Sequence, residues 1–206
     1  MDAQIITGAA LDVLDEVGLD KLSMRLVAAR LGVQVGGLYY YVADKAALLR
    51  AMADELCEQV MGEFGSRGRT AALELCRSLR AVLNRHRDSA RVLAASPLNG
   101  SLNALALMER LIEILEPDVG DGLANAAADT LMAYVTGFVL QEQSGIPVRF
   151  PLTLAELADR FPRIFRAVGR GDDDEFDLAV TTIIAGFRRP APGVSWSLAE
   201  AGSGCD

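Results

Sequence analysis

The sequence has few of the residues from which most catalytic and metal sites are built. It contains a single histidine, His86, and three cysteines that lie far apart and form no CxxC pair, namely Cys57, Cys76 and Cys205. Catalytic triads and two-histidine metal sites need a partner for that histidine, and an odd number of distant cysteines predicts neither a disulfide framework nor a zinc ribbon. An enzyme would have to rely on carboxylates, and these fall at predicted helix starts and on exposed faces. We therefore expect no catalytic residue, no metal and no cofactor.

Long apolar runs are also absent. The longest stretches without a charge, such as Leu98–Met108 and Thr130–Leu140, are shorter than the roughly 20 residues that a membrane span needs. The first helix carries acidic residues at Asp12, Asp15 and Glu16 rather than a basic signal segment. With 206 residues, of which 51% are hydrophobic, the chain is long enough to bury a core. We expect a soluble, cytoplasmic protein without a membrane partner.

Positive charge is scarce but unevenly placed. The chain has 20 lysines and arginines against 28 acidic residues, and a net charge of −8. This balance disfavours binding to a phosphate backbone unless basic residues are concentrated locally. Residues 21–50 provide such a concentration, because five basic residues face one acidic residue there: Lys21, Arg25, Arg30, Lys45 and Arg50 against Asp44. We expect contact with DNA through this segment only.

Apolar residues recur at helical spacing along nearly the whole chain, and no stretch alternates for long enough to predict a sheet. The predicted fold class is therefore all α. In the N-terminal part the pattern predicts helices over 3–17, 24–31, 35–41 and 45–64. Further along, it predicts helices over 70–87, 89–95, 101–115, 121–144, 154–168 and 172–188.

Capping and helix-breaking residues mark the helix boundaries. Ser23 and Asp44 are placed to cap the second and fourth helices, and Gly18 is placed to end the first. Leu26 is assigned to the inward face of the second helix. Pro117 is expected to end the helix before it, and Pro162 to kink or split the helix around it.

Three short helices followed by a long one, with a tight turn at Gly32, form the pattern of a helix-turn-helix domain. We assign residues 1–45 to this DNA-binding domain and residues 46–189 to a helical-bundle domain for ligand binding and dimerisation. Residues 190–206 are rich in proline and glycine, so we expect a mostly disordered tail in which Trp196 could still dock on the body.

One segment makes the helix-turn-helix assignment specific. The stretch LGVQVGGLYYYVADKAALL, Leu31–Leu49, resembles the end of the DNA-binding domain of TetR-family transcriptional regulators. The segments RHRDSARVLAASP (85–97), TGFVLQEQS (136–144) and DDDEFDLAVTTIIAGF (172–187) resemble the body of its tetracycline-repressor-like subclass. This resemblance implies a homodimeric repressor that binds a palindromic double-stranded operator and is released by a small-molecule effector.

The start of the third helix is expected to enter the major groove. Gln34 is the side chain there that can pair with a base edge, Val35 suits a thymine methyl, and Gly36 and Gly37 let the backbone approach closely. The family usually has larger residues in place of the two glycines. We therefore expect few side-chain contacts to base edges, and we expect DNA shape to contribute to sequence specificity.

The resemblance assigns further DNA contacts residue by residue. It implies that Tyr39 and Tyr40 touch backbone or base, that Tyr41 and Lys45 contact phosphate, and that Ser23 and Arg25 touch phosphate and base. Alternatively, two of the tyrosines are core aromatics and the basic side chains are merely solvated.

The resemblance also implies an effector pocket lined by Met61, Leu75, Leu79, Leu93, Ser96, Glu109, Asn125, Met132 and Gln141. In members that bind tetracycline the drug arrives as a magnesium chelate. The positions that match their drug-binding and magnesium-binding histidines are Met61 and Leu93, which cannot ligate a hard cation. We therefore expect another effector, a bulky apolar molecule such as a drug or secondary metabolite. The alternative is that the methionines are ordinary core residues and that Glu109 belongs to a solvated stripe.

In the family, the helices matching 121–144 and 172–188 form an intersubunit four-helix bundle, and the fourth helix transmits effector binding to the DNA-binding domain as a lever. Both bundle helices here carry wide apolar faces: Leu131, Tyr134, Val135 and Phe138, and Phe176, Val180, Ile183, Ile184 and Phe187. These faces could also pack only within one subunit. A helical ligand-binding or scaffolding protein without sequence-specific DNA binding is the alternative function.

Overall fold

The computed structural model describes residues 2–61, 68–96, 101–144, 151–166 and 171–187. These residues form helices and connecting turns and contain no strand, as the sequence pattern predicts. The helices are α1 Ala3–Val17, α2 Met24–Arg30, α3 Val35–Tyr39, α4 Lys45–Val60, α5 Arg69–Leu83, α6 Ser89–Ala94, α7 Leu102–Val119, α8 Asp121–Gln143, α9 Leu154–Arg160, α10 Pro162–Phe165 and α11 Asp172–Gly186.

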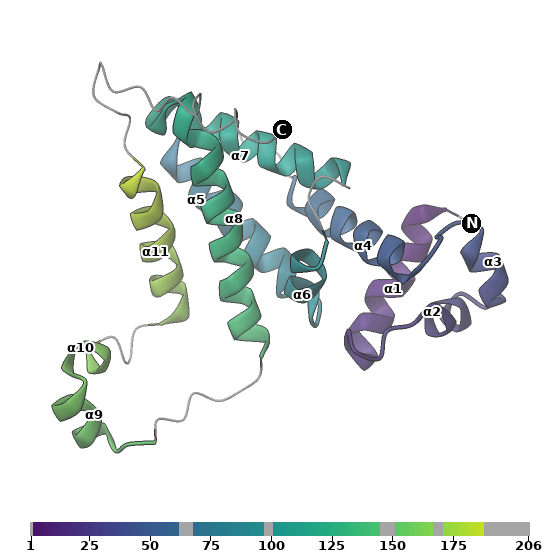
Figure 1. The fold of residues 1–206 in the computed structure, drawn as a ribbon, viewed down its shortest axis with the longest axis horizontal. Coiled ribbons are helices and arrows are strands. Elements are labelled where there is room, and N and C mark those ends of the chain that lie inside the picture. The colour runs from purple at the N-terminus through teal and green to yellow at the C-terminus, as the bar shows by residue number, and fades with distance from the viewer. Residues whose placement is uncertain (1, 62–67, 97–100, 145–150, 167–170, 188–206) are drawn as a thin grey trace, which may run out of the picture.

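The first three helices form a small unit at one end of the molecule, and α4 runs from this unit into the larger helical body (Figure 1). Local capping explains where the helices begin. The Ser23 side chain accepts a hydrogen bond from the Leu26 amide, and the Asp44 carboxylate accepts one from the Ala47 amide at 2.6 Å. Both predicted caps are confirmed, and each fixes the direction in which the following helix leaves its turn.

The body is built around α8, which packs against α5, α6, α7 and α11. By length and composition α8 is the one helix among the described residues that could cross a membrane. Its apolar residues Leu131, Val135 and Val139 are instead fully buried in the helical core. The short helices α9 and α10 lie together beyond the ends of α8 and α11 (Figure 1).

Several predicted helix boundaries differ from the structure. The third helix ends at Tyr39 rather than Tyr41. Pro117 does not end α7, because a proline in the last turn removes a single donor and the helix continues to Val119, where the Gly120 amide donates to Glu116. Pro162 splits its helix as predicted and opens α10. The predicted end of the fourth helix at Phe64 and the tail 190–206 lie outside the described residues.

The prediction that Leu26 faces inward is wrong. Its side chain is 40% exposed, whereas Met24, Val27 and Ala28 bury the inner face of α2. The helix has only seven residues, so its buried face is narrow and Leu26 falls outside it.

Candidate nucleic-acid interface and effector cavities

The turn between α2 and α3 holds the geometry of a helix-turn-helix. Gly32 adopts φ +69°, a conformation that glycine takes without strain, and the Val33 amide closes the turn on the Ala28 carbonyl at 3.0 Å. Leu38 is fully buried and anchors α3 on the small domain. Gly36, Gly37 and Tyr39 of the same helix are exposed.

The start of α3 presents little side-chain bulk. Gln34 is exposed and its side chain makes no capping hydrogen bond, so the amide is available to a ligand. A Cβ atom added at Gly36 or Gly37 would meet nothing within 4 Å. Val35 is half-buried against the core. The two glycines therefore open a smooth patch of backbone beside the Gln34 side chain.

The three tyrosines that follow are all exposed: Tyr39 by 49%, Tyr40 by 86% and Tyr41 by 50%. Tyr40 and Tyr41 contact each other edge to face, with ring centroids 5.2 Å apart. The alternative that two of them are core aromatics is wrong, because only Leu38 from this stretch is buried in the core. An exposed aromatic cluster at the end of α3 suits contact with a phosphate backbone and sugars.

The basic segment is less free than the sequence implies. The Arg30 guanidinium is held by Asp12 and Glu16 of α1, which neutralises one of the five positive charges. The Lys45 ammonium lies 3.4 Å from the Leu19 carbonyl, to which it donates. Arg25 is exposed and has no ion pair among the described residues. The apolar side chains of Leu26 and Val33 are exposed in the same unit. Sequence reasoning missed the exposure of Leu26, because periodicity assigned it to the core.

Two cavities flank α8 in the body. One, of about 500 Å³, lies between α6 and α8 and includes Leu93, Ser96 and Met132. The other, of about 550 Å³, lies between α7 and α8 and includes Glu109 and Asn125. Five of the nine predicted pocket residues therefore line these two cavities. Asp129 lines both, so the cavities adjoin.

The other four predicted pocket residues lie elsewhere. Leu75 and Leu79 are buried in the core, and Met61 follows the end of α4 with 37% of its surface exposed. Gln141 lines a third cavity, of about 570 Å³, together with Tyr134, Glu142, Asp172 and Glu175. None of the four lines the two cavities beside α6 and α7.

Asp129 is the charged residue among the cavity residues that sequence reasoning missed. It follows Asn125 by one helical turn, and the Asn125 amide donates to its carboxylate at 3.3 Å. That spacing was the available signal. Ser96, which follows α6, connects the same region to α4, because its hydroxyl donates to the Leu49 carbonyl of α4 at 3.3 Å and to the Val92 carbonyl of α6 at 2.9 Å.

A polar cluster joins α5, α8 and α11 on the other side of the body. The Arg80 guanidinium binds the Glu142 and Asp173 carboxylates and lies over the rings of Phe138 and Phe176, 5.0 and 4.8 Å from the centroids. Burial alone would raise the pKa of Glu142, but hydrogen bonds from Arg80 and Asn84 outweigh it and hold the pKa below its ordinary value. This cluster fastens α11 to the body.

Two family models account for most of the chain. Residues 6–52 match the model described as bacterial regulatory proteins, tetR family, and residues 66–190 match the tetracyclin repressor-like C-terminal domain. The chain therefore belongs to the TetR family. It is a DNA-binding transcriptional regulator, and the family is not one of enzymes.

Individual relatives agree with this assignment. Over 141 residues the chain is 35% identical to tetracycline repressor protein class A from transposon 1721 of Escherichia coli. The alignment covers 66% of this chain and 65% of the relative. It is similar to ActR of Streptomyces coelicolor in complex with (S)-DNPA, with a TM-score of 0.75, 29% identity and coverage of 91% and 96%. It is also similar to BioQ with its natural double-stranded DNA operator, with a TM-score of 0.65, 29% identity and coverage of 86% and 99%.

Proposed function

We propose that this protein is a cytoplasmic, homodimeric repressor that binds a palindromic operator and is released from it by a small, mainly apolar effector. The observation that carries the proposal is the exposed α3, anchored by Leu38 and flanked by the open Gln34 side chain and three exposed tyrosines. A BioQ structure of the same fold contains operator DNA, and an ActR structure contains a small molecule, which supports both halves of the proposal.

On DNA, α3 lies in the major groove with its start toward the bases. Gln34 pairs with a base edge, Val35 faces a thymine methyl, and Gly36 and Gly37 bring the backbone close. Phosphates on either side are held by Tyr39, Tyr40, Tyr41, Lys45, Ser23 and Arg25. Lys45 donates one proton to Leu19 and has two others left for a phosphate.

The effector occupies the adjoining cavities beside α6, α7 and α8, with Leu93, Ser96, Glu109, Asn125 and Met132 in its wall. Their lining is mostly apolar, which favours a bulky hydrophobic body. The described residues of the two linings include carboxylates at Asp129 and Glu109 and no lysine or arginine. An apolar molecule with a basic nitrogen therefore fits better than an anion. Met61, Leu75, Leu79 and Gln141 remain candidates for a ligand that reaches further into the body.

The dimer uses α8 and α11, as the family resemblance implies. Phe176, Val180 and Ile184 of α11 are buried within the subunit, so they are taken by the fold itself. The outward side of α11 is free in one subunit and carries Leu178, which is 51% exposed, beside Thr181 and Thr182. We assign that outward side to the partner subunit.

In vitro selection of DNA from a random pool tests operator binding. The recovered sequences are expected to be palindromic, with half-sites about one helical turn or somewhat more apart, and binding is expected to survive excess nonspecific competitor. Competitor-sensitive binding without sequence preference would favour the scaffolding alternative. The observation in favour of that alternative is the lack of side chains at Gly36 and Gly37, which leaves few groups to read a base sequence.

Two substitutions distinguish a residue that contacts phosphate from a residue that reads the base sequence. Lys45→Ala is expected to weaken binding to all DNA sequences by a similar factor and to reduce the salt dependence, because it removes a phosphate contact. Gln34→Ala is expected to relax the preference at one base position of the half-site. Fluorescence anisotropy with the selected operator and with single-base variants, at two salt concentrations, measures both effects. Unchanged affinity of both variants would remove these residues from the interface.

A further inference from the structure

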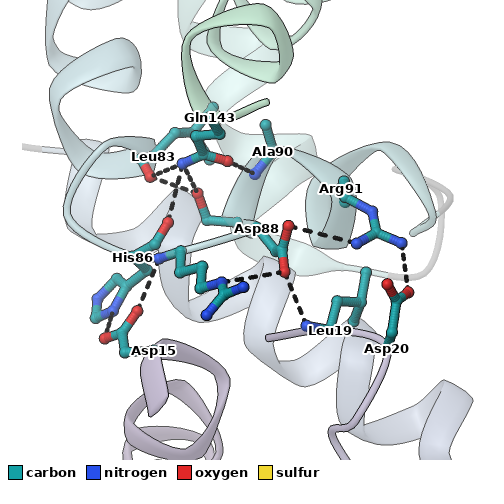
Figure 2. A network of polar contacts seen from close by, with 11 residues as sticks. Asp15, Leu19, Asp20, Leu83, His86, Asp88, Ala90, Arg91 and Gln143 are labelled. Atoms are coloured by element: carbon teal, nitrogen blue, oxygen red, sulfur yellow. Dashed lines mark hydrogen bonds and ion pairs between the residues drawn. The ribbon is translucent and has the colours of Figure 1, made fainter. Parts of the chain in front are cut away.

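The corner between α5 and α6, residues 83–91, contacts the small DNA-binding unit directly (Figure 2). Asp88 adopts a left-handed conformation, φ 57°, and its carboxylate does not cap α6. It instead accepts a hydrogen bond of 2.9 Å from the Leu19 amide in the turn between α1 and α2. Asp88 therefore places a carboxylate of the effector domain on the backbone of the other domain.

Glycine at position 18 makes this approach possible. Gly18 has φ +76°, and a Cβ atom added there would lie 3.0 Å from the Asp88 carboxylate. A side chain at this position would be strained by its own backbone and would also press on Asp88. The turn and the corner are thus fitted to each other.

Three more contacts surround this hydrogen bond. Asp15 of α1 binds both the His86 ring and the Arg87 amide, each at 2.8 Å. Arg91 of α6 lies 2.7 Å from Asp20 and 3.4 Å from Asp88. Together they form a clasp, by which we mean the contacts of Asp15, Leu19 and Asp20 with His86, Arg87, Asp88 and Arg91 (Figure 2).

The end of α8 holds the corner from the other side. The Gln143 side-chain nitrogen donates to the carbonyls of Leu83 and His86, at 2.8 and 2.9 Å, and lies 3.2 Å from the Ser89 hydroxyl. Its oxygen accepts from the Ala90 amide at 3.4 Å. The Gln143 side chain thus bridges both arms of the corner (Figure 2). A shift of the α8 end would therefore move the corner with it.

Gln143 also lies close to the effector cavity. Leu140, three residues earlier on α8, lines the cavity between α6 and α8, as does Thr136 one turn before it. Three residues of helix correspond to about 4.5 Å. A ligand that displaces the wall of this cavity therefore acts on a helix whose last turn holds the corner.

We propose that Gln143 and Asp88 are positioning residues that fix the DNA-binding unit against the effector domain and so set the separation of the two recognition helices in the dimer. Apart from the clasp, the small unit is held by α4 and by the packing of α1 against it. The clasp adds a further point of attachment. This inference rests on the proposed palindromic binding and concerns the spacing of half-sites, not their sequence.

The test compares operators that differ only in the spacing of their half-sites. The variants are Gln143→Ala and Asp88→Asn; the matched controls are Gln59→Ala, on α4, and Asp177→Asn, whose ion pair with Arg77 stays within the effector domain. Affinity for each spacing and for an isolated half-site is measured by fluorescence anisotropy. The wild type and both controls are expected to prefer one spacing, whereas the two variants lose that preference by about fivefold or more. Affinity for the half-site stays unchanged.

Hydrogen exchange of the Leu19 amide monitors the clasp itself and is expected to become faster in Asp88→Asn. Faster exchange with an unchanged spacing preference would overturn the proposal and leave the clasp a merely structural contact. Equal losses at all spacings and at the half-site would indicate partial unfolding of the two variants. In that case the surface variant Arg91→Gln, which removes the ion pairs with Asp20 and Asp88, takes their place. A lost spacing preference with unchanged half-site affinity then supports the proposal, and an unchanged preference overturns it. Failure of the wild type to prefer any palindrome would instead reject the proposed function.

Discussion

Gly36 and Gly37 give α3 a face without side chains, and this has opposite consequences for stability and for binding. Neither glycine has a positive φ, and a Cβ atom at either position meets open space. Alanine there is expected to stabilise the DNA-binding domain by about 0.5–1 kcal/mol, because glycine loses more backbone entropy in a helix. The added methyl group would stand between the helix and the floor of the groove.

We therefore expect Gly36→Ala and Gly37→Ala to raise the midpoint of urea unfolding and to weaken operator binding. Gly122→Ala in α8, where a Cβ atom also meets nothing within 4 Å, is the control that gains stability without a change in DNA affinity. Equal operator affinity of all three variants would mean that this face of α3 does not approach DNA.

For single residues, exposure on a short helix could be predicted from the sequence, whereas contacts between residues far apart in the chain could not. The exposure of Gln34 and of the tyrosines follows from their place on a short helix with one buried anchor, Leu38. The pairing of Arg30 with α1 and the contact of Lys45 with Leu19 join residues far apart in the chain. No spacing rule relates such residues, so a charge count over residues 21–50 overstates the charge that remains for DNA.

At the scale of elements, capping residues were the most reliable signal, since each acts within one turn of its own position. Ser23, Asp44 and Pro162 all determine boundaries where the sequence placed them. The prediction from Pro117 was wrong because the effect of a proline depends on its distance from the helix end. The Gly120 cap places that end after Val119. The cavity between α7 and α8 was predicted only in part, because the meeting of Glu109 and Asp129 depends on how two helices cross.

The cap of α4 offers a prediction at this scale. Asp44→Ala is expected to destabilise the protein by about 1 kcal/mol, because the Ala47 amide loses its acceptor at the start of the helix that links the two domains. Asp44→Ser restores an acceptor and is expected to recover most of the loss. Urea unfolding monitored by circular dichroism gives both values. A serine variant as unstable as the alanine variant would assign the effect to something other than capping.

For the whole molecule, the attachment of α11 is expected to depend on pH through Glu142. Because its pKa in the folded protein lies below the ordinary value, the charged form stabilises the fold at neutral pH. That stabilisation is present above the ordinary glutamate pKa of about 4.3 and is lost as the pH falls through the lower folded value. Glu142→Gln is therefore expected to be less stable at pH 7 and to lose less stability between pH 5 and 3. Urea unfolding of the wild type and of Glu142→Gln at pH 7, 5 and 3 measures this difference.

Dimerisation determines whether the DNA-binding domains of two subunits can bind both half-sites of a palindrome together. The buried side of α11 is occupied by its own subunit, which leaves Leu178 as the large apolar side chain on its outward side. Leu178→Asp would bury a charge in the proposed interface and is expected to give a folded monomer by analytical ultracentrifugation. Its affinity for the palindrome should fall to that for one half-site, because the second contact is no longer linked to the first. Leu102→Asp, at an 82% exposed position on α7, should remain a dimer with full affinity. A Leu178→Asp dimer with full affinity would move the interface away from the outward side of α11.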